Sequence, residues 1–200
     1  EPMIKRNGVF ESPENLWVKY NGEHINNTWA VNFTVKGNEK QEWIFRPKIG
    51  DFVYSDKTWS SILSETKTCV GVITDVRSKD FDFIALQQTG DAVWATSSSI
   101  ADVTTETNIS LAICDFAGKT NSQNIILAKP AENTAAHKCA AYSTEGFSAG
   151  SWFLPSCGQW NVFQLNKTKI NASISAAGGI IVSDETEYWT STQYDADRSW

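Results

Sequence analysis

The sequence has few of the residues and motifs from which metal and nucleophile sites are built. It contains only two histidines, His24 and His137, and neither has a partner at metal-ligand spacing. The motifs G-x-S-x-G and H-E-x-x-H are absent. The sequence allows a catalytic dyad of His137 with Cys139 or Cys157, but a surface or capping histidine is the simpler interpretation. We therefore expect no metal, no cofactor and no catalytic residue, in a protein that is not an enzyme.

No two cysteines form a C-x-x-C motif, which argues against a zinc ribbon and a thioredoxin-like site. The four cysteines are Cys69, Cys114, Cys139 and Cys157. Four cysteines allow three disulfide pairings, and the sequence does not choose among them. Four buried free thiols are an equally good alternative, because an unpaired cysteine packs as a small hydrophobic residue.

Long apolar runs and basic patches are missing as well. No window of about 18 apolar residues occurs, so no transmembrane helix and no membrane insertion are expected. The net charge of −6 argues against nucleic acid as a partner, since phosphates are bound by basic surfaces. The stretch FAGKT ends like a phosphate loop, but Ile113 stands where that loop requires a glycine. Nucleotide binding is therefore not expected.

Acidic residues near the C-terminus do not form a calcium-binding motif. The carboxylates are Asp184, Glu185, Glu187, Asp195 and Asp197. Asp195 and Asp197 could supply oxygens to calcium, which takes six to eight of them, but the EF-hand pattern is absent. A solvated acidic loop is the simpler interpretation.

Alternating apolar residues predict β structure in residues 1–47. Apolar side chains recur at every second position in TWAVNFTVKG and in EWIFRP. The polar stretches YNGEH and KGNEKQ separate these runs as hairpin loops do. Pro47 ends the segment. We expect a small N-terminal β segment at 1–47, a remnant or stalk of a β-sandwich, followed by a larger domain at 48–200.

The larger domain opens with strands and continues with helices. The near-continuous apolar run TCVGVITDV, residues 68–76, predicts a buried central strand. Shorter strands are expected within residues 50–54, before the turn Ser55-Asp56-Lys57, and in 81–98, before the turn Gly90-Asp91. The stretches NSQNIILAK and ENTAAHKCAAY each predict a short helix.

The clearest local signals lie in residues 156–179. Ser156 followed by Gln159 forms an S-x-x-Q capping box at a helix start. A second helix, capped by Asn166, is expected to follow the first. Gly178 and Gly179 end it, as a left-handed glycine does after a helix. Short strands and polar turns are expected from there to the C-terminus.

The residues before the capping box predict a structural joint. Trp152 and Phe153 are expected to end a strand and pack into the core. Pro155 keeps Leu154 out of helical geometry. Cys157 stands at the first helical position, where a helix lowers the pKa of a thiol, but we expect it to be packed or paired.

These stretches together resemble a known family of bacterial surface domains. GSWFLPSCGQWNVFQLNKTKINASISAAGG and EYWTSTQYDADRSW resemble the family patterns G-W-x-L-P-S-x-G-E, N-K-x-x-I-N-x-x-L-x-x-x-G-G and Y-W-S-S-T-E-Y. GDFVYSDKTWSSIL, TKTCVGVITDV and FAGKTNSQNI resemble earlier family blocks, so the likeness covers residues 49–200. The signature positions are Trp152, Leu154, Pro155, Ser156, Gly158, Trp160, Gly178 and Gly179.

The family includes the C-terminal domains of collagen-like adhesins and the fibrobacter major paralogous domain. The resemblance implies an α+β, C-type lectin-like fold of short twisted antiparallel strands with two or three helices. The formylglycine-generating-enzyme fold is a more distant relative. Cys157 and Gln159 depart from the joint pattern, and Lys57 replaces a turn glycine. The family continues with a closing strand beyond the Y-W-S-S-T block, so either the domain is truncated at Trp200 or its closing strand is supplied otherwise.

What the resemblance implies is binding rather than catalysis. Ligands of this fold are recognised by the C-terminal loops, where retroelement-diversified members also vary. The candidate ligand-binding residues are Tyr188, Trp189, Thr190, Ser191, Thr192, Gln193, Tyr194, Asp195, Asp197, Arg198 and Trp200. Trp189 and Trp200 are also candidates for the core, whereas Gln193, Tyr194 and the aspartates are expected to be exposed. Aromatic planes, hydroxyls and amides suit such a face.

The expected function is that of an exported, adhesin-like domain that binds a glycan or a cell-surface protein. The calcium tripeptides of lectins are absent, so calcium-dependent sugar binding is not supported. The first alternative is a structural or receptor-binding tip module of a pilus or phage tail. An enzyme related to the formylglycine-generating fold is a minor alternative, because only Leu154-Pro155-Ser156 matches it. Self-association into a homo-oligomer stays open.

Overall fold

The computed structural model describes residues 47–77, 80–95, 99–195 and 198–200, together with the backbone of six short strands within residues 4–43. The chain divides into two units, Glu1–Pro47 and Lys48–Trp200. The division falls at Pro47, where the alternating β pattern of the sequence ends.

The described strands of the first unit form three antiparallel hairpins. They pair β1 (Ile4–Arg6) with β2 (Val9–Glu11), β3 (Val18–Tyr20) with β4 (Glu23–Ile25), and β5 (Val31–Thr34) with β6 (Lys40–Trp43). The last two hairpins connect their strands across the predicted loops YNGEH and KGNEKQ, but Glu23, His24, Lys40 and Gln41 of those loops lie in the strands β4 and β6. The residues between the paired strands lie outside the described residues. The predicted strand positions Leu16, Trp29, Val35 and Phe45 lie outside the described residues.

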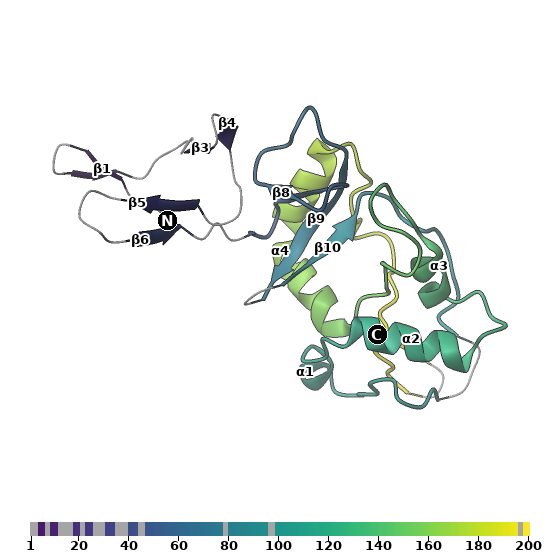
Figure 1. Cartoon of the computed structure of the whole chain (residues 1–200). Coiled ribbons are helices and arrows are strands. Elements are labelled where there is room, and N and C mark those ends of the chain that lie inside the picture. Colours follow the sequence, from purple (N-terminus) through teal and green to yellow (C-terminus); the bar gives the residue numbers. More distant parts are fainter. Residues whose placement is uncertain are drawn as a thin grey trace. The chain divides into compact units, whose positions relative to one another are not determined.

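The second unit is built on a four-stranded antiparallel sheet (Figure 1). Its strands are β7 (Phe52–Tyr54), β8 (Trp59–Ser60), β9 (Cys69–Val76) and β10 (Phe81–Ala85), in the spatial order β10–β9–β7–β8. Strand β9 lies between β10 and β7, and Val72 and Ile73 within it are completely buried. The prediction of a buried central strand is therefore confirmed.

A break in register changes which side chains of β9 share a face of the sheet. The pairing of β7 with β9 shifts between Val53 and Tyr54, which displaces the usual alternation of side chains. As a result Val70 packs with Ile73 on one face instead of with Val72 on the other. The adjacent residues Val72 and Ile73 contribute to the hydrophobic layers of opposite faces.

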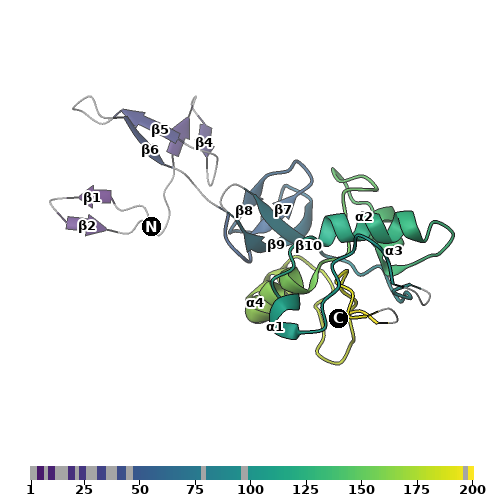
Figure 2. The ribbon, with the colours of Figure 1, turned by 90° about the horizontal axis from the view of Figure 1, so that it is seen from below.

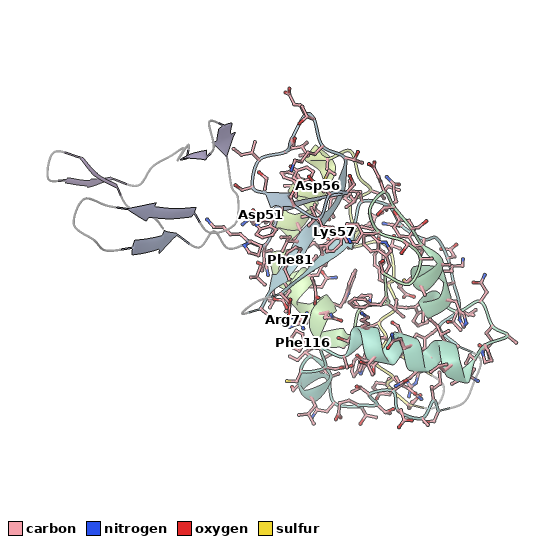
Figure 3. The ribbon with its side chains drawn as sticks, viewed as in Figure 1. Asp51, Asp56, Lys57, Arg77, Phe81 and Phe116 are labelled. Carbon is pink, nitrogen blue, oxygen red and sulfur yellow. The ribbon has the colours of Figure 1, made fainter. Side chains whose placement is uncertain are left out.

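The turn between β7 and β8 accommodates a residue that the family pattern does not contain. Lys57, which stands where the pattern that the sequence resembles has a glycine, has a left-handed φ of 66°. The preceding Asp56 accepts hydrogen bonds from the backbone N–H and the hydroxyl of Thr58, at 3.0 and 2.6 Å. A hydrogen bond from Lys67, followed by those of Thr58, lowers the pKa of Asp56 to about 2. This polar network fixes a turn that lacks the conformational freedom of glycine (Figure 3).

Four helices occur in the described part of the second unit. They are α1 (Ile109–Ala112), α2 (Gly118–Ala128), α3 (Ala135–Ala141) and α4 (Cys157–Ala176). The sequence predicted α2 and α3 but missed the single turn of α1. Antiparallel strands and separate helices confirm the α+β class. None of these helices combines the length and the hydropathy that crossing a membrane requires.

Helix α4 is one helix, so the prediction of two helices divided at Asn166 is wrong. The Asn166 amide donates a hydrogen bond to the carbonyl of Val162, 2.9 Å away and one turn earlier, instead of capping a new helix. The end of α4 agrees with the prediction. Gly178 has a φ of 74° and donates its N–H to Ser175 at 3.0 Å, and Gly179 donates to Ile174 at 2.9 Å. These two bonds form a Schellman motif.

Two hydrophobic clusters hold the sheet and the helices together. Helix α4 packs against β9 on one face of the sheet (Figure 2). The cluster beneath it consists of Phe52, Tyr54, Val72, Phe163, Ile170, Ile174 and Val182. A second cluster lies under α2 and α3 and consists of Trp94, Ile100, Val103, Ile125, Ala135, Ala136 and Leu154. Leu154 thus connects the segment before α4 to the second cluster.

The segment after α4 has no regular strand among its described residues, so the strands predicted there are wrong. Its only β-type contacts in the described chain are isolated bridges from Gln193 to Thr105 and to Ser199. The backbone still bonds to the rest of the unit, because Ser191 donates to the carbonyl of Pro155 at 2.7 Å and Gln193 to that of Thr104 at 2.9 Å. The C-terminal segment is therefore packed irregularly into the second unit.

Candidate functional site

The predicted joint is the point at which α2, α4 and the preceding loop meet. The capping box is present, and the Gln159 side-chain oxygen accepts the backbone N–H of Ser156 at 3.0 Å. The Ser156 hydroxyl and the Gly158 N–H both donate to the carbonyl of Asp115, at 2.6 and 2.9 Å. A Cβ atom at position 158 would lie 2.3 Å from that oxygen, so this close approach requires glycine. The signature therefore has a structural explanation.

The Asp115 carboxylate extends the joint to the C-terminal segment. It is buried and accepts hydrogen bonds from the Thr192 hydroxyl at 2.6 Å, the Asn121 amide at 2.9 Å and the Ala117 N–H at 2.8 Å. The Thr192 hydroxyl in turn accepts the backbone N–H of Cys157 at 2.8 Å. Sequence reasoning missed this connection, because its partners are far apart in the chain.

The central part of the predicted ligand face is buried. Thr190, Ser191, Thr192 and Gln193 are at most 2% exposed. The prediction that Gln193 is exposed is wrong, because its side-chain oxygen accepts the Ile100 N–H at 3.2 Å and its amide donates to the Asp195 carbonyl at 2.6 Å. In the folded chain these four residues cannot touch a ligand on the surface.

The remaining members of the predicted face fall into two groups. Trp189 is 44% exposed, so it is not part of the core. Tyr194 and Trp200 are half-buried and their rings meet edge to face at 5.0 Å. Arg198 lies 4.5 Å from the centre of the Tyr194 ring and bonds to the Asp195 carboxylate at 3.0 Å. Asp197 lies outside the described residues.

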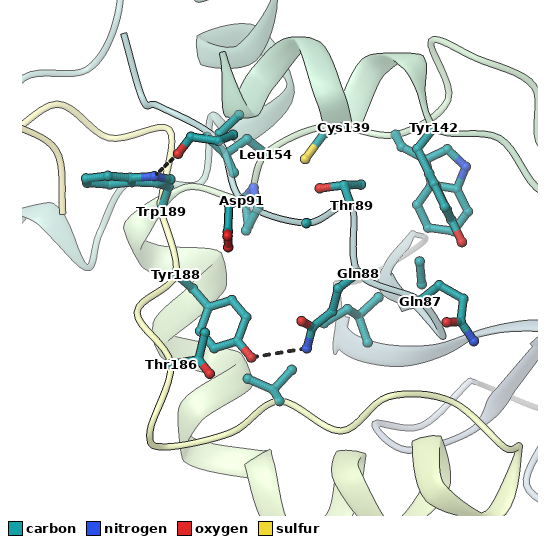
Figure 4. A pocket seen from close by; sticks show the side chains of 18 of the residues that line it. Gln87, Gln88, Thr89, Asp91, Cys139, Tyr142, Leu154, Thr186, Tyr188 and Trp189 are labelled. Carbon is teal, nitrogen blue, oxygen red and sulfur yellow. Dashed lines mark hydrogen bonds between the residues drawn. The ribbon is translucent and has the colours of Figure 1, made fainter. Parts of the chain in front are cut away.

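A cavity opens beside Tyr188 and Trp189 (Figure 4). Its volume is about 320 Å³. The walls come from the end of β10 and the residues up to 92, from α3 and the following Tyr142, from residues 152–155 of the joint, from Trp160 of α4, and from residues 180–189 after α4. We call this cavity the aromatic pocket. It brings the joint together with the first two residues of the predicted face.

Six aromatic side chains line the aromatic pocket. They are Tyr142, Trp152, Phe153, Trp160, Tyr188 and Trp189. Trp160 lies 5.2 Å from Tyr188, and Trp152 meets Tyr142 edge to face at 5.3 Å, measured between ring centres. The prediction that Trp152 and Phe153 end a strand is wrong, because both lie in an irregular segment. Their rings supply pocket wall instead.

Hydrogen bonds join the two polar walls of the aromatic pocket. The Gln88 amide donates to the Tyr188 hydroxyl at 3.1 Å and to the carbonyl of Ile181 at 3.5 Å (Figure 4). The backbone N–H of Ser183 also donates to that hydroxyl, at 3.3 Å. The Trp189 indole donates to the carbonyl of Ala92 at 2.8 Å. Because the Tyr188 oxygen accepts two bonds, its own proton can be donated to a ligand.

The charged groups that line the aromatic pocket are all acidic. Asp91 and Glu187 are exposed, and no lysine, arginine or histidine is among the lining residues. The only cation that bonds to this loop among the described residues is Lys138, whose ammonium group donates to the backbone carbonyl of Asp91 and not to its carboxylate. Sequence reasoning missed Asp91 and Gln88, although the polar run QQTGD after a strand was a weak signal.

The cysteines of this region are free thiols whose pKa is raised by burial. All four cysteines of the chain are free, so none of the three disulfide pairings is present, but Cys114 is exposed and the alternative of four buried thiols is wrong for that residue. Cys139 lines the aromatic pocket, and burial raises its pKa to about 11. Burial also raises the pKa of Cys157, and the nearby Asp115 charge adds to the effect. These two causes outweigh the lowering of the Cys157 pKa that the start of a helix would produce, so this thiol is not a candidate nucleophile.

Thiol labelling in the folded protein is expected to follow burial. At pH 8 an aromatic disulfide reagent should modify the exposed Cys114 rapidly. Cys139 and Cys157 should react at least tenfold more slowly, because the reagent reaches them only at roughly the rate of local opening. Denatured, unreduced protein should release four equivalents. Fewer than four would show a disulfide that contradicts the structure.

No group of three or more histidine, cysteine or acidic side chains is arranged to hold a metal ion within the described ranges. Comparison with known proteins adds no relative, because no family model, no curated protein and no solved structure matches the chain. The family resemblance therefore rests on the order and spacing of the sequence blocks alone.

Proposed function

We propose that residues 48–200 form a C-type lectin-like domain that binds a carbohydrate without chemical conversion, on the outside of the cell. The α+β architecture and the structural explanation of the joint signature support this fold. The capping box at Ser156, the close approach at Gly158 and the left-handed Gly178 account physically for three of the signature positions. The expectation of an exported adhesin-like protein follows from the same resemblance.

The observation that carries the proposal is the composition of the aromatic pocket. A volume of about 320 Å³ lies at the lower end of the range typical of small-molecule sites. Flat aromatic rings stack on the apolar faces of sugar rings, while amide, hydroxyl and carboxylate groups bind their hydroxyls. The pocket combines six such rings with polar groups of Gln88, Thr89, Asp91 and Tyr188. Its concave shape favours one or two sugar units over a flat protein surface.

The pocket changes which residues are proposed to bind. Tyr188 and Trp189 keep the role that the sequence assigned to them, since both line the cavity. Tyr194, Asp195 and Arg198 belong to a separate cluster that does not line it. The proposed site is therefore the aromatic pocket and not the whole C-terminal face.

A glycan array followed by titration of two variants tests this proposal. We expect Trp189→Ala to weaken binding of an array hit by about tenfold, because the exposed ring supplies a stacking face of the site. Tyr194→Ala is the matched control, since it removes an aromatic ring from the same segment outside the pocket. This control should bind within about twofold of the parent protein.

Circular dichroism and thermal melting should show that both variants stay folded. Loss of binding in Tyr194→Ala together with normal binding in Trp189→Ala would move the site to the outer cluster. A glycan array without any hit would contradict carbohydrate recognition.

A further inference from the structure

We propose that the carbohydrate recognised by the aromatic pocket carries a free, protonated amino group, as a hexosamine does. This inference rests on the proposed function and specifies its ligand class. It follows from a combination of charge and ring placement that the family resemblance does not contain. Sugars without charge, N-acetylated sugars and acidic sugars would then be poorer ligands.

The charge of the pocket wall is the first observation. Asp91 and Glu187 line the cavity, and in the described part of the chain neither carboxylate makes a hydrogen bond or an ion pair with a side chain. Lys138 bonds to the backbone carbonyl of Asp91 and lies outside the lining, so it steadies the loop and only partly offsets the charge. The wall therefore presents two acidic side chains that have no side-chain partner among the described residues.

The placement of Asp91 is the second observation. Figure 4 shows its carboxylate pointing into the open centre of the pocket, toward the side where Tyr188 and Gln88 meet. Trp189 lies on the same wall, because its indole is bonded to the carbonyl of Ala92, the next residue. A ligand entering here meets a carboxylate and an indole ring together. That pairing suits an ammonium group, which is attracted both by the carboxylate and by an aromatic face.

N-acetylated and acidic sugars lack the positive charge that the carboxylate and the indole ring would attract. An N-acetyl group replaces the cation by a neutral amide, which forms neither an ion pair nor a cation–π contact. A uronic acid brings a negative charge toward Asp91 and Glu187 without a basic residue in the lining to receive it. The pocket therefore discriminates by charge, while the rings and Tyr188 bind the sugar frame that all three ligands share.

Isothermal titration of matched oligosaccharides tests the inference. The probes are a chitosan oligomer, with free amines, the chitin oligomer of equal length, with N-acetyl groups, and an oligouronate. At pH 6 we expect the full chain to bind the chitosan oligomer about tenfold more tightly than the chitin oligomer, the range of a charge-assisted hydrogen bond. Raising the salt concentration should reduce this ratio.

Two variants separate the pocket charge from charge in general. Asp91→Asn keeps the shape of the side chain and should lower the ratio to about twofold, leaving chitin binding unchanged. Glu185→Gln is the control, because Glu185 is an exposed acid two positions from Glu187 that does not line the pocket, and it should preserve the ratio.

Each result has a distinct meaning. Equal binding of chitosan and chitin, or a ratio that Asp91→Asn leaves intact, overturns the amine inference while carbohydrate binding stands. Failure of the chain to bind any sugar, on the array or by titration, overturns the proposed function and the inference with it. Equal loss of the ratio in Glu185→Gln and Asp91→Asn shows non-specific attraction and overturns the inference alone.

Discussion

Replacement of Asp115 by alanine is expected to lower the free energy of unfolding by about 3–5 kcal/mol. The buried carboxylate is the acceptor for the Thr192 hydroxyl, the Asn121 amide and the Ala117 N–H. Alanine leaves these donors in a buried space without a partner, and each buried unsatisfied group costs about 1–3 kcal/mol. The loss is large because one side chain joins the start of α2 to the C-terminal segment.

Urea denaturation followed by tryptophan fluorescence measures this effect. Asp115→Asn should fall between the parent protein and alanine, since one amide oxygen remains to accept hydrogen bonds. Asp184→Ala is the control: its carboxylate is 89% exposed and pairs only with Lys167 among the described residues, so it should cost less than about 1 kcal/mol. Equal stability of Asp115→Ala and Asp184→Ala would show that the network at Asp115 contributes nothing.

The parts of the fold that could be predicted were those specified by neighbouring residues. Ser156 and Gln159 are three positions apart and start α4, and Gly178 ends it through bonds to residues one turn away. Strand β9 was recognised from its continuous apolar run. In each case the physical cause lies within one segment, so a single stretch of sequence contains the whole signal.

The same locality explains where prediction failed. Asp115 looks like an ordinary loop residue, because its partners Ser156 and Thr192 lie 41 and 77 positions away. The division of α4 at Asn166 was predicted because asparagine favours caps, whereas the intact helix satisfies the amide one turn back. Both outcomes depend on tertiary contacts that local propensity does not contain.

The candidate site was predicted in part for a related reason. The stretch from Thr190 to Gln193 is polar and therefore resembles a surface loop, yet its polar groups are buried. Thr192 and Gln193 find internal hydrogen-bond partners that replace water. Tyr188 and Trp189 were identified correctly as candidates, but the opposite wall around Asp91 comes from a segment about 100 residues earlier in the chain.

Replacement of Gln193 by alanine distinguishes a buried structural amide from a ligand contact. We expect the free energy of unfolding to fall by about 2–4 kcal/mol, from a cavity and from the buried Ile100 N–H left without its acceptor. The Gln193 side chain now accepts that N–H at 3.2 Å and also donates to the carbonyl of the half-buried Asp195 at 2.6 Å. The affinity of the fraction that stays folded should be unchanged, because Gln193 does not line the aromatic pocket.

Thermal melting and titration of the same samples separate the two effects. Gln87→Ala provides the opposite case, since Gln87 is exposed and lines the pocket, so its stability should stay within about 0.5 kcal/mol of the parent. A Gln193→Ala protein that keeps normal stability but loses binding would show that Gln193 contacts the ligand and that the site lies on the C-terminal face. An unstable protein whose folded fraction binds normally would show that the polar residues after Trp189 stabilise the fold and do not contact the ligand. Ligand recognition would then fall to the side chains that line the aromatic pocket.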